Sequence, residues 1–131
     1  MNLKTVSVTV SAPKDQVFAY LADVENMPEW ATQFCKELKV VNGKHKVLTP
    51  RGEIFFRIQA DEKMGVIDMF GGPTEDQMAL FPTRVLDVPG GGSAFLFTLF
   101  QEPGVTDQQF EEQLRELRQE LENVKRHFDS R

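Results

Sequence analysis

Two charged residues lie among apolar neighbours in the middle of the chain, and they are the first candidates for chemistry. Asp68 lies between Ile67 and Met69, and Arg84 precedes Val85. A carboxyl group buried in an apolar cavity has a raised pKa and could act as a general acid or base. A buried arginine could bind a carboxylate or an enolate on a ligand. Asp68 is therefore the one candidate catalytic residue, and Arg84 a candidate ligand anchor.

Each of these residues has an alternative role on the solvent side of a strand, which we favour. Asp68 could form a cross-strand ion pair with Arg57, and Arg84 could be an ordinary surface arginine. The hairpin register decides for Asp68, because a slip of one residue exchanges the two faces of a strand. Opposite Ile58, Asp68 would face the core, whereas opposite Arg57 it would face solvent. The turn at residues 61–65 does not fix this register.

No other group of residues predicts a catalytic or metal site. His45 and His127 are far apart, and Cys, His, Asp and Glu do not recur at metal-ligand spacing. Cys35, the single cysteine, is expected to be a half-buried inert thiol. The run 90–93 lacks the lysine and the following helix of a phosphate-binding loop. We therefore expect no metal and no cofactor.

Composition excludes several classes of protein. The 131 residues suit one domain, residues 1–131. The 20 acidic residues outnumber 15 scattered basic ones, for a net charge of -5, which argues against nucleic acid as a partner. No run of about 20 apolar residues predicts an integral membrane segment. The N-terminus lacks a signal-peptide pattern and no disulfide pair exists, so a cytoplasmic location is expected.

The first 30 residues predict a strand and two helices. Alternating apolar residues from Val6 to Val10 indicate a half-buried strand. A helix is expected over residues 13–23, because proline suits a first helical turn. Asn26, with Glu29 three residues later, predicts the capped start of a second, short helix.

The rest of the chain predicts a sheet followed by one long helix. Strands separated by turn residues run from 35 to 101, including one over 77–88 whose Pro82 suggests an edge or a bulge. Thr106 and Gln109 predict a capping box that opens the last helix. Charged residues, Glu120 among them, fill most faces of this helix, and its apolar residues form a stripe at alternating intervals of four and three: Phe110, Leu114, Leu117, Leu121, Val124 and Phe128. A helix that crosses a curled antiparallel sheet contacts it well only along a line. The fold class is therefore α+β, with room for an apolar small molecule under the helix.

Three segments resemble the SRPBCC superfamily, which includes START-like, birch-pollen-allergen-like and polyketide cyclase/dehydrase-like proteins. They are residues 6–13 (VSVTVSAP), 17–23 (VFAYLAD) and 26–30 (NMPEW), and the likeness extends from residue 98 through the last helix. The resemblance implies a helix-grip fold: a curved antiparallel sheet of about seven strands, two short helices and a long C-terminal helix. It also implies a deep cavity between the sheet and that helix.

Binding of a hydrophobic small molecule in this cavity is the predicted function, the ligand being lipid-like, aromatic or polyketide-like. The 11 phenylalanines could form its rigid apolar walls or could simply fill the core. One alternative is a cyclase/dehydrase-type enzyme that uses a cavity carboxylate, and another is a protein-interaction module with a filled interior. The candidate cavity residues are Trp30, Phe34, Phe56, Asp68, Arg84, Phe97, Leu117 and Leu121.

The strand at residues 94–100 is apolar on both faces. Phe95, Phe97 and Leu99 face one way, and Ala94, Leu96 and Phe100 face the other. A sheet whose back faces solvent should not be apolar on both sides. We therefore expect something to cover the back of the sheet, and a homodimer is the hypothesis.

Overall fold

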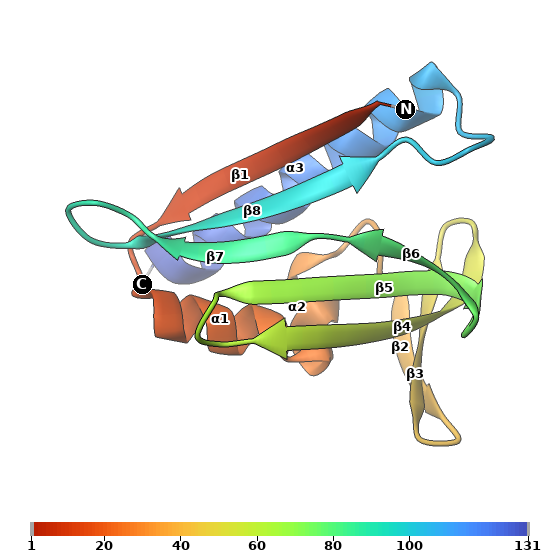
Figure 1. Cartoon of the computed structure of the whole chain (residues 1–131), viewed down its shortest axis with the longest axis horizontal. Helices are drawn as coiled ribbons and strands as arrows, with labels where there is room; N and C mark the ends of the chain where they lie inside the picture. The colour runs from red at the N-terminus through yellow and green to blue at the C-terminus, as the bar shows by residue number, and fades with distance from the viewer. Residues whose placement is uncertain (1, 131) are drawn as a thin grey trace.

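The computed structural model describes residues 2–130 and shows an antiparallel sheet with every helix on one face (Figure 1). This is the α+β helix-grip architecture predicted from the sequence. In chain order the elements are β1 (Leu3–Val10), α1 (Lys14–Ala22), the 3₁₀ turn η1 (Val24–Asn26), α2 (Met27–Trp30), β2 (Glu37–Val41), β3 (Lys44–Thr49), β4 (Gly52–Asp61), β5 (Val66–Thr74), β6 (Gln77–Phe81), β7 (Thr83–Asp87), β8 (Ser93–Phe100) and α3 (Asp107–Asp129).

The strands form one curved sheet in the order β1-β8-β7-β5-β4-β3-β2, with β6 also paired to β5. The predicted single strand over 77–88 is divided at Pro82 into β6 and β7. Proline has no N–H to donate and interrupts the ladder there, while its carbonyl accepts from the Thr98 N–H at 2.9 Å. The break lets β6 pair with the second half of β5, while β7 lies between β5 and β8.

The two short helices connect β1 to the rest of the sheet. Helix α1 begins directly after Pro13, as predicted, and buries Val17, Phe18 and Leu21. The predicted cap at Asn26 is wrong, since its side chain makes no cap hydrogen bond. Its amide instead donates to the Tyr20 carbonyl at 3.0 Å.

Helix α3 has the cap and the apolar stripe that the sequence predicts. The Thr106 hydroxyl accepts from the Gln109 N–H, and the Gln109 side chain accepts from the Thr106 N–H. The stripe residues are buried against the sheet and α1: Phe110, Leu114, Leu117, Leu121, Val124 and Phe128.

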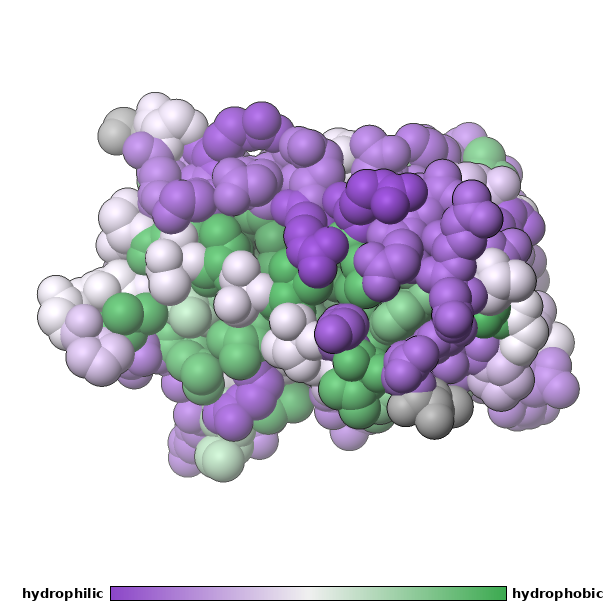
Figure 2. Space-filling model, turned by 90° about the horizontal axis from the view of Figure 1, so that it is seen from above, coloured by the Kyte–Doolittle hydropathy of each residue, from purple (hydrophilic) through white to green (hydrophobic). Residues whose placement is uncertain are grey.

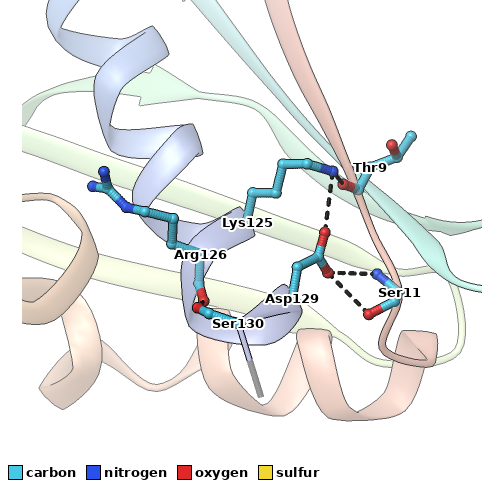
Figure 3. Close-up of polar contacts among 6 residues, drawn as sticks. All are labelled: Thr9, Ser11, Lys125, Arg126, Asp129 and Ser130. Carbon is cyan, nitrogen blue, oxygen red and sulfur yellow. Dashed lines mark hydrogen bonds and ion pairs between the residues drawn. The ribbon is translucent and has the colours of Figure 1, made fainter.

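The C-terminal end of α3 is fastened to the end of β1 (Figure 3). Oδ1 of Asp129 accepts from the backbone N–H and the hydroxyl of Ser11, at 2.8 and 2.9 Å. Lys125 donates to the Thr9 carbonyl at 2.6 Å and pairs with Asp129 at 3.1 Å. The bonds to Ser11 and Thr9 join residues more than a hundred positions apart and fix one end of the helix.

The inner face of the sheet forms the core with the helices. Seen from the side of β1 and α3, apolar residues gather in a band with hydrophilic residues on either side (Figure 2). On the outer face, the Arg57 guanidinium lies 4.1 Å from the centre of the Phe70 ring, and Lys46 lies 4.5 Å from that of Phe55. Long cationic side chains therefore cover part of the apolar outer surface within the chain.

Candidate functional site

A cavity of about 330 Å³ lies between the inner face of the sheet, α2 and the first half of α3. The helix and the sheet diverge here, because α3 contacts the sheet mainly along β1. The exposed lining residues Pro50, Arg51 and Glu102 mark its opening to solvent. The lining is predominantly apolar and comprises Met27, Trp30, Ala31, Phe34, Thr49, Pro50, Arg51, Ile54, Phe56, Met69, Gly71, Gly72, Phe81, Phe97, Leu99, Phe100, Glu102, Val105, Gln113, Glu116, Leu117 and Glu120.

Aromatic rings form a connected wall on one side of this cavity. The Phe34 ring lies 6.0 Å from that of Phe56 and 6.5 Å from that of Phe81, centroid to centroid. Phe81 in turn lies 6.1 Å from Phe97. Gly71 lies directly opposite Phe56 on β5, and the side chains of Ile54 and Phe56 pack against the position that its Cβ would occupy. Rings in mutual contact keep fixed positions, so the cavity is preformed.

Five of the eight residues predicted for the cavity line it, namely Trp30, Phe34, Phe56, Phe97 and Leu117. They come from α2 and the segment after it, from β4 and β8, and from α3. Leu121 is only 2% exposed, but it packs in the core and is not part of the lining. The periodicity of α3 identified its buried face, and the cavity occupies only part of that face.

Asp68 and Arg84 do not line the cavity, which corrects their inclusion among its residues. Asp68 pairs with Gln59 across the hairpin, so Ile67 and Met69 occupy the inner face. Asp68 lies beside a polar surface depression, and Arg57 stacks on Phe70 and forms no ion pair with Asp68. Arg84 is exposed and donates to the Met64 carbonyl at 2.7 Å. The catalytic candidacy of Asp68 therefore has no structural basis.

The buried carboxyl group of the cavity lining is that of Glu120, on α3. Its side chain is 5% exposed, and its Oε2 accepts from the backbone N–H groups of Gln33 and Phe34 at 3.1 and 2.9 Å. Burial raises the pKa of Glu120 from 4.5 to about 7, more than these two hydrogen bonds lower it. Glu120 therefore exchanges a proton near neutral pH, which is the property sought in Asp68.

Spacing along α3 could have identified Glu120. It lies three residues after Leu117 and four before Val124, two members of the buried stripe. Residues three and four apart share a helix face, so a charge at this position should point inward. Burial and the Glu120 charge together raise the pKa of the Cys35 thiol, which agrees with the expected unreactive cysteine.

One contact spans the opening of the cavity. Arg51 lies in the turn between β3 and β4, and Gln113 lies on α3. With the Gln113 amide turned so that its oxygen faces Arg51, that oxygen accepts from both terminal guanidinium nitrogens at 2.9 Å. The tip of the hairpin is thereby connected to the helix beside the mouth of the cavity.

This arrangement can bind an apolar molecule and present the buried carboxyl group of Glu120 to it. Among residues 2–130, no group of three His, Cys, Asp or Glu side chains is placed to hold a metal ion. Within the same residues, no helix is long and apolar enough to cross a membrane. The cavity lining offers apolar contact, hydrogen bonding and proton exchange at Glu120.

Comparison with known families agrees with this geometry. The family model described as polyketide cyclase / dehydrase and lipid transport matches residues 10–62, which include α1, α2 and β2 to β4. No curated protein matches the sequence significantly. The match covers residues 17–23 and 26–30, two of the segments on which the resemblance to the SRPBCC superfamily rests, and half of the segment 6–13.

Solved structures match over nearly the whole chain. The protein XoxI from Bacillus cereus is 16% identical, with a TM-score of 0.76 over 98% of this chain and 96% of that one. The Aha1 dimer from Colwellia psychrerythraea is 12% identical, with a TM-score of 0.72 over 98% and 97%. The di-domain ARO/CYC BexL from the BE-7585A biosynthetic pathway is 17% identical, with a TM-score of 0.73 over 98% and 46%. At these identities the likeness confirms the helix-grip fold, and with the family match it confirms the resemblance to the SRPBCC superfamily.

Proposed function

We propose that this helix-grip protein binds a small hydrophobic molecule in the cavity between its sheet and α3. The observation that supports this best is the cavity itself, about 330 Å³ of preformed space with aromatic walls. A domain of this size would normally pack such a volume with side chains, because empty space forfeits dispersion contacts. The family description of lipid transport and polyketide cyclisation agrees with an apolar guest.

The cavity volume limits the guest to about two rings or a short chain, since it is at the small end of ligand pockets. A two-ring guest that buries roughly 250 Å² gains about 6 kcal/mol at about 25 cal/mol per Å². Immobilising the guest offsets part of this gain. We therefore expect dissociation constants between about 1 µM and 1 mM for simple apolar probes.

A cavity-filling variant tests the binding site. Prodan, a two-ring naphthalene dye whose emission shifts to the blue in apolar surroundings, is titrated into the wild type, Leu99→Trp and Leu96→Trp. Leu99 lines the cavity, whereas Leu96 lies three residues earlier on the outer face of the same strand. The first substitution should lower probe affinity at least tenfold, and the second should leave it within a factor of two. Equal affinity of all three proteins would place the probe elsewhere and contradict the proposal.

General acid–base catalysis by Glu120 is a second candidate, because its pKa of about 7 suits proton transfer at neutral pH. The probe reaction is elimination of 5-nitrobenzisoxazole. The base removes the C3 proton, the N–O bond breaks, and 2-cyano-4-nitrophenolate is released and absorbs visible light. The rate should rise with pH through about 7 and be lost in Glu120→Gln. Asp68→Asn, outside the cavity, should retain it, and a rate equal in all three proteins would exclude the role for Glu120.

The interaction-module alternative predicts a filled interior, and the cavity argues against it.

The homodimer and the cytoplasmic location stay predictions. A dimer through the outer face is supported by half-buried Leu86 and Leu96 on neighbouring strands and by the dimeric form of the Aha1 neighbour. Sedimentation that shows a monomer at tens of micromolar would contradict it.

A further inference from the structure

The charges that line the cavity are mostly negative. Three carboxyl groups, those of Glu102, Glu116 and Glu120, face one guanidinium, that of Arg51. The guanidinium lies at the mouth and is hydrogen-bonded to Gln113. Glu116 lies one helical turn before Glu120, and its charge helps to raise the pKa of Glu120. A guest that enters this cavity therefore meets a negative potential at the apolar walls.

Glu120 directs one oxygen toward the guest. Its Oε2 is occupied by the backbone N–H groups of Gln33 and Phe34. Its Oε1 takes part in none of the hydrogen bonds or ion pairs found for residues 2–130. In the same residues every fully buried side-chain oxygen or nitrogen has a partner, so Oε1 is not sealed in the protein. Because Glu120 lines the cavity, this oxygen is accessible to a bound molecule.

A cationic guest fits this oxygen better than a neutral or an anionic one. Removing a carboxylate from water without a counter-charge is costly, and a cation beside it recovers that cost through a charge-assisted hydrogen bond. An anionic guest would instead be repelled by Glu116 and Glu120. Aromatic faces such as Phe34 and Trp30 add attraction for a cation within about 6 Å of a ring centre. The apolar walls and the free carboxylate oxygen together describe an amphiphilic amine.

We infer that the natural guest is a small hydrophobic amine, an aromatic or aliphatic framework with one basic nitrogen whose protonated form pairs with Glu120. The inference rests on the proposed binding function and names its ligand class. In this arrangement the basic nitrogen lies beside Oε1 of Glu120, and the apolar framework lies against Phe34, Phe56 and Phe97.

Three probes of one framework and different charge test the inference by calorimetric titration at pH 8. They are 2-(aminomethyl)naphthalene, which is a cation, 2-naphthalenemethanol, which is neutral, and 2-naphthoate, which is an anion. We expect the amine to bind at least tenfold more tightly than the alcohol and the naphthoate to bind more weakly than both. In Glu120→Gln the amine should lose this preference while the alcohol keeps its affinity.

The pH dependence gives a second readout that needs no variant. With a pKa of about 7, the ionised fraction of Glu120 falls about tenfold from pH 8 to pH 6, so amine affinity should fall by up to tenfold while alcohol affinity stays level. The other charged or titratable groups near Glu120, on α3, in the segment after α2 and across the cavity, are Glu116, Cys35, Lys36, Arg51 and Glu102. Glu116→Gln should lower amine affinity less than Glu120→Gln does.

The outcomes separate this inference from the binding function. If none of the three probes binds, the binding function itself fails. If the alcohol or the naphthoate binds as tightly as the amine at pH 8, binding stands and the amine inference is overturned. An amine preference that is unchanged in Glu120→Gln, or amine affinity that is level between pH 6 and pH 8, would also overturn it.

Discussion

The raised pKa of Glu120 should make the folded protein lose stability as pH rises, and Glu120→Gln should remove that loss. In the unfolded chain Glu120 ionises near 4.5, whereas in the folded chain it ionises near 7. Between these values the unfolded state binds fewer protons, so the free energy of unfolding falls with increasing pH. The Glu120 contribution is fully present below 4.5 and is lost as pH rises through about 7.

The size of the effect follows from the two pKa values. Each pH unit is worth about 1.4 kcal/mol, so the interval between them corresponds to about 3 kcal/mol. Glutamine is the matched replacement, because its amide oxygen can still accept from the N–H groups of Gln33 and Phe34. The other ionisable groups are shared by both proteins, so the difference between their unfolding free energies isolates Glu120.

Urea unfolding is measured at pH 4 and pH 8 and followed by the fluorescence of Trp30, the single tryptophan. Relative to the wild type, Glu120→Gln should gain about 3 kcal/mol of stability between the two pH values. Glu122→Gln, an exposed carboxylate on the same helix, is the control and should run parallel to the wild type. A Glu120→Gln curve that is also parallel would refute the argument that burial holds this carboxyl group neutral.

Two further predictions concern the frame around the cavity. Gly65 has φ of +68°, and a Cβ there would collide with the Val85 carbonyl oxygen. Gly65→Ala should therefore lower the free energy of unfolding, measured in urea, by about 2 kcal/mol or more. An unchanged unfolding midpoint would contradict this. Asp129→Asn should speed amide hydrogen exchange in the last turn of α3 at pH 7, because the Asp129 carboxylate accepts from the Ser11 backbone N–H and pairs with Lys125. The same bonds hold the pKa of Asp129 below 3.8. The Asp129 contribution is lost as pH falls through that low pKa, so the difference should shrink in acid, and equal exchange at pH 7 would show that the bond does not fix the helix end.

Local patterns predicted the frame of the fold correctly. Alternation from Val6 to Val10, the Thr106–Gln109 capping box and the stripe on α3 each depend on neighbours within one element. Pro82 was interpreted as an irregularity within one strand, and the structure makes it the boundary between two. The orientation of the Asp68 side chain depends on the register between β4 and β5. The turn that joins these two strands does not specify that register from sequence.

Glu120 was missed for a different reason. Charged residues fill most of the surface of α3, and the sequence pattern places Glu120 with them, outside the apolar stripe. Helical spacing places it on the buried face, but only the position of the segment after α2 supplies the two N–H groups that hold it there. The cavity likewise depends on where the helix and sheet diverge, which no single element determines.

The polar fastening of α3 at Lys125 and Asp129 makes the two ends of this helix unequal. Its final turns are held to β1 and packed around Phe128, whereas the turns near Gln113 contact the hairpin tip mainly through Arg51. For the proposed guest, we expect exchange through separation of the Arg51 hairpin tip from Gln113, while the last turns of α3 stay bonded to β1. Such a local opening would not require unfolding of the core.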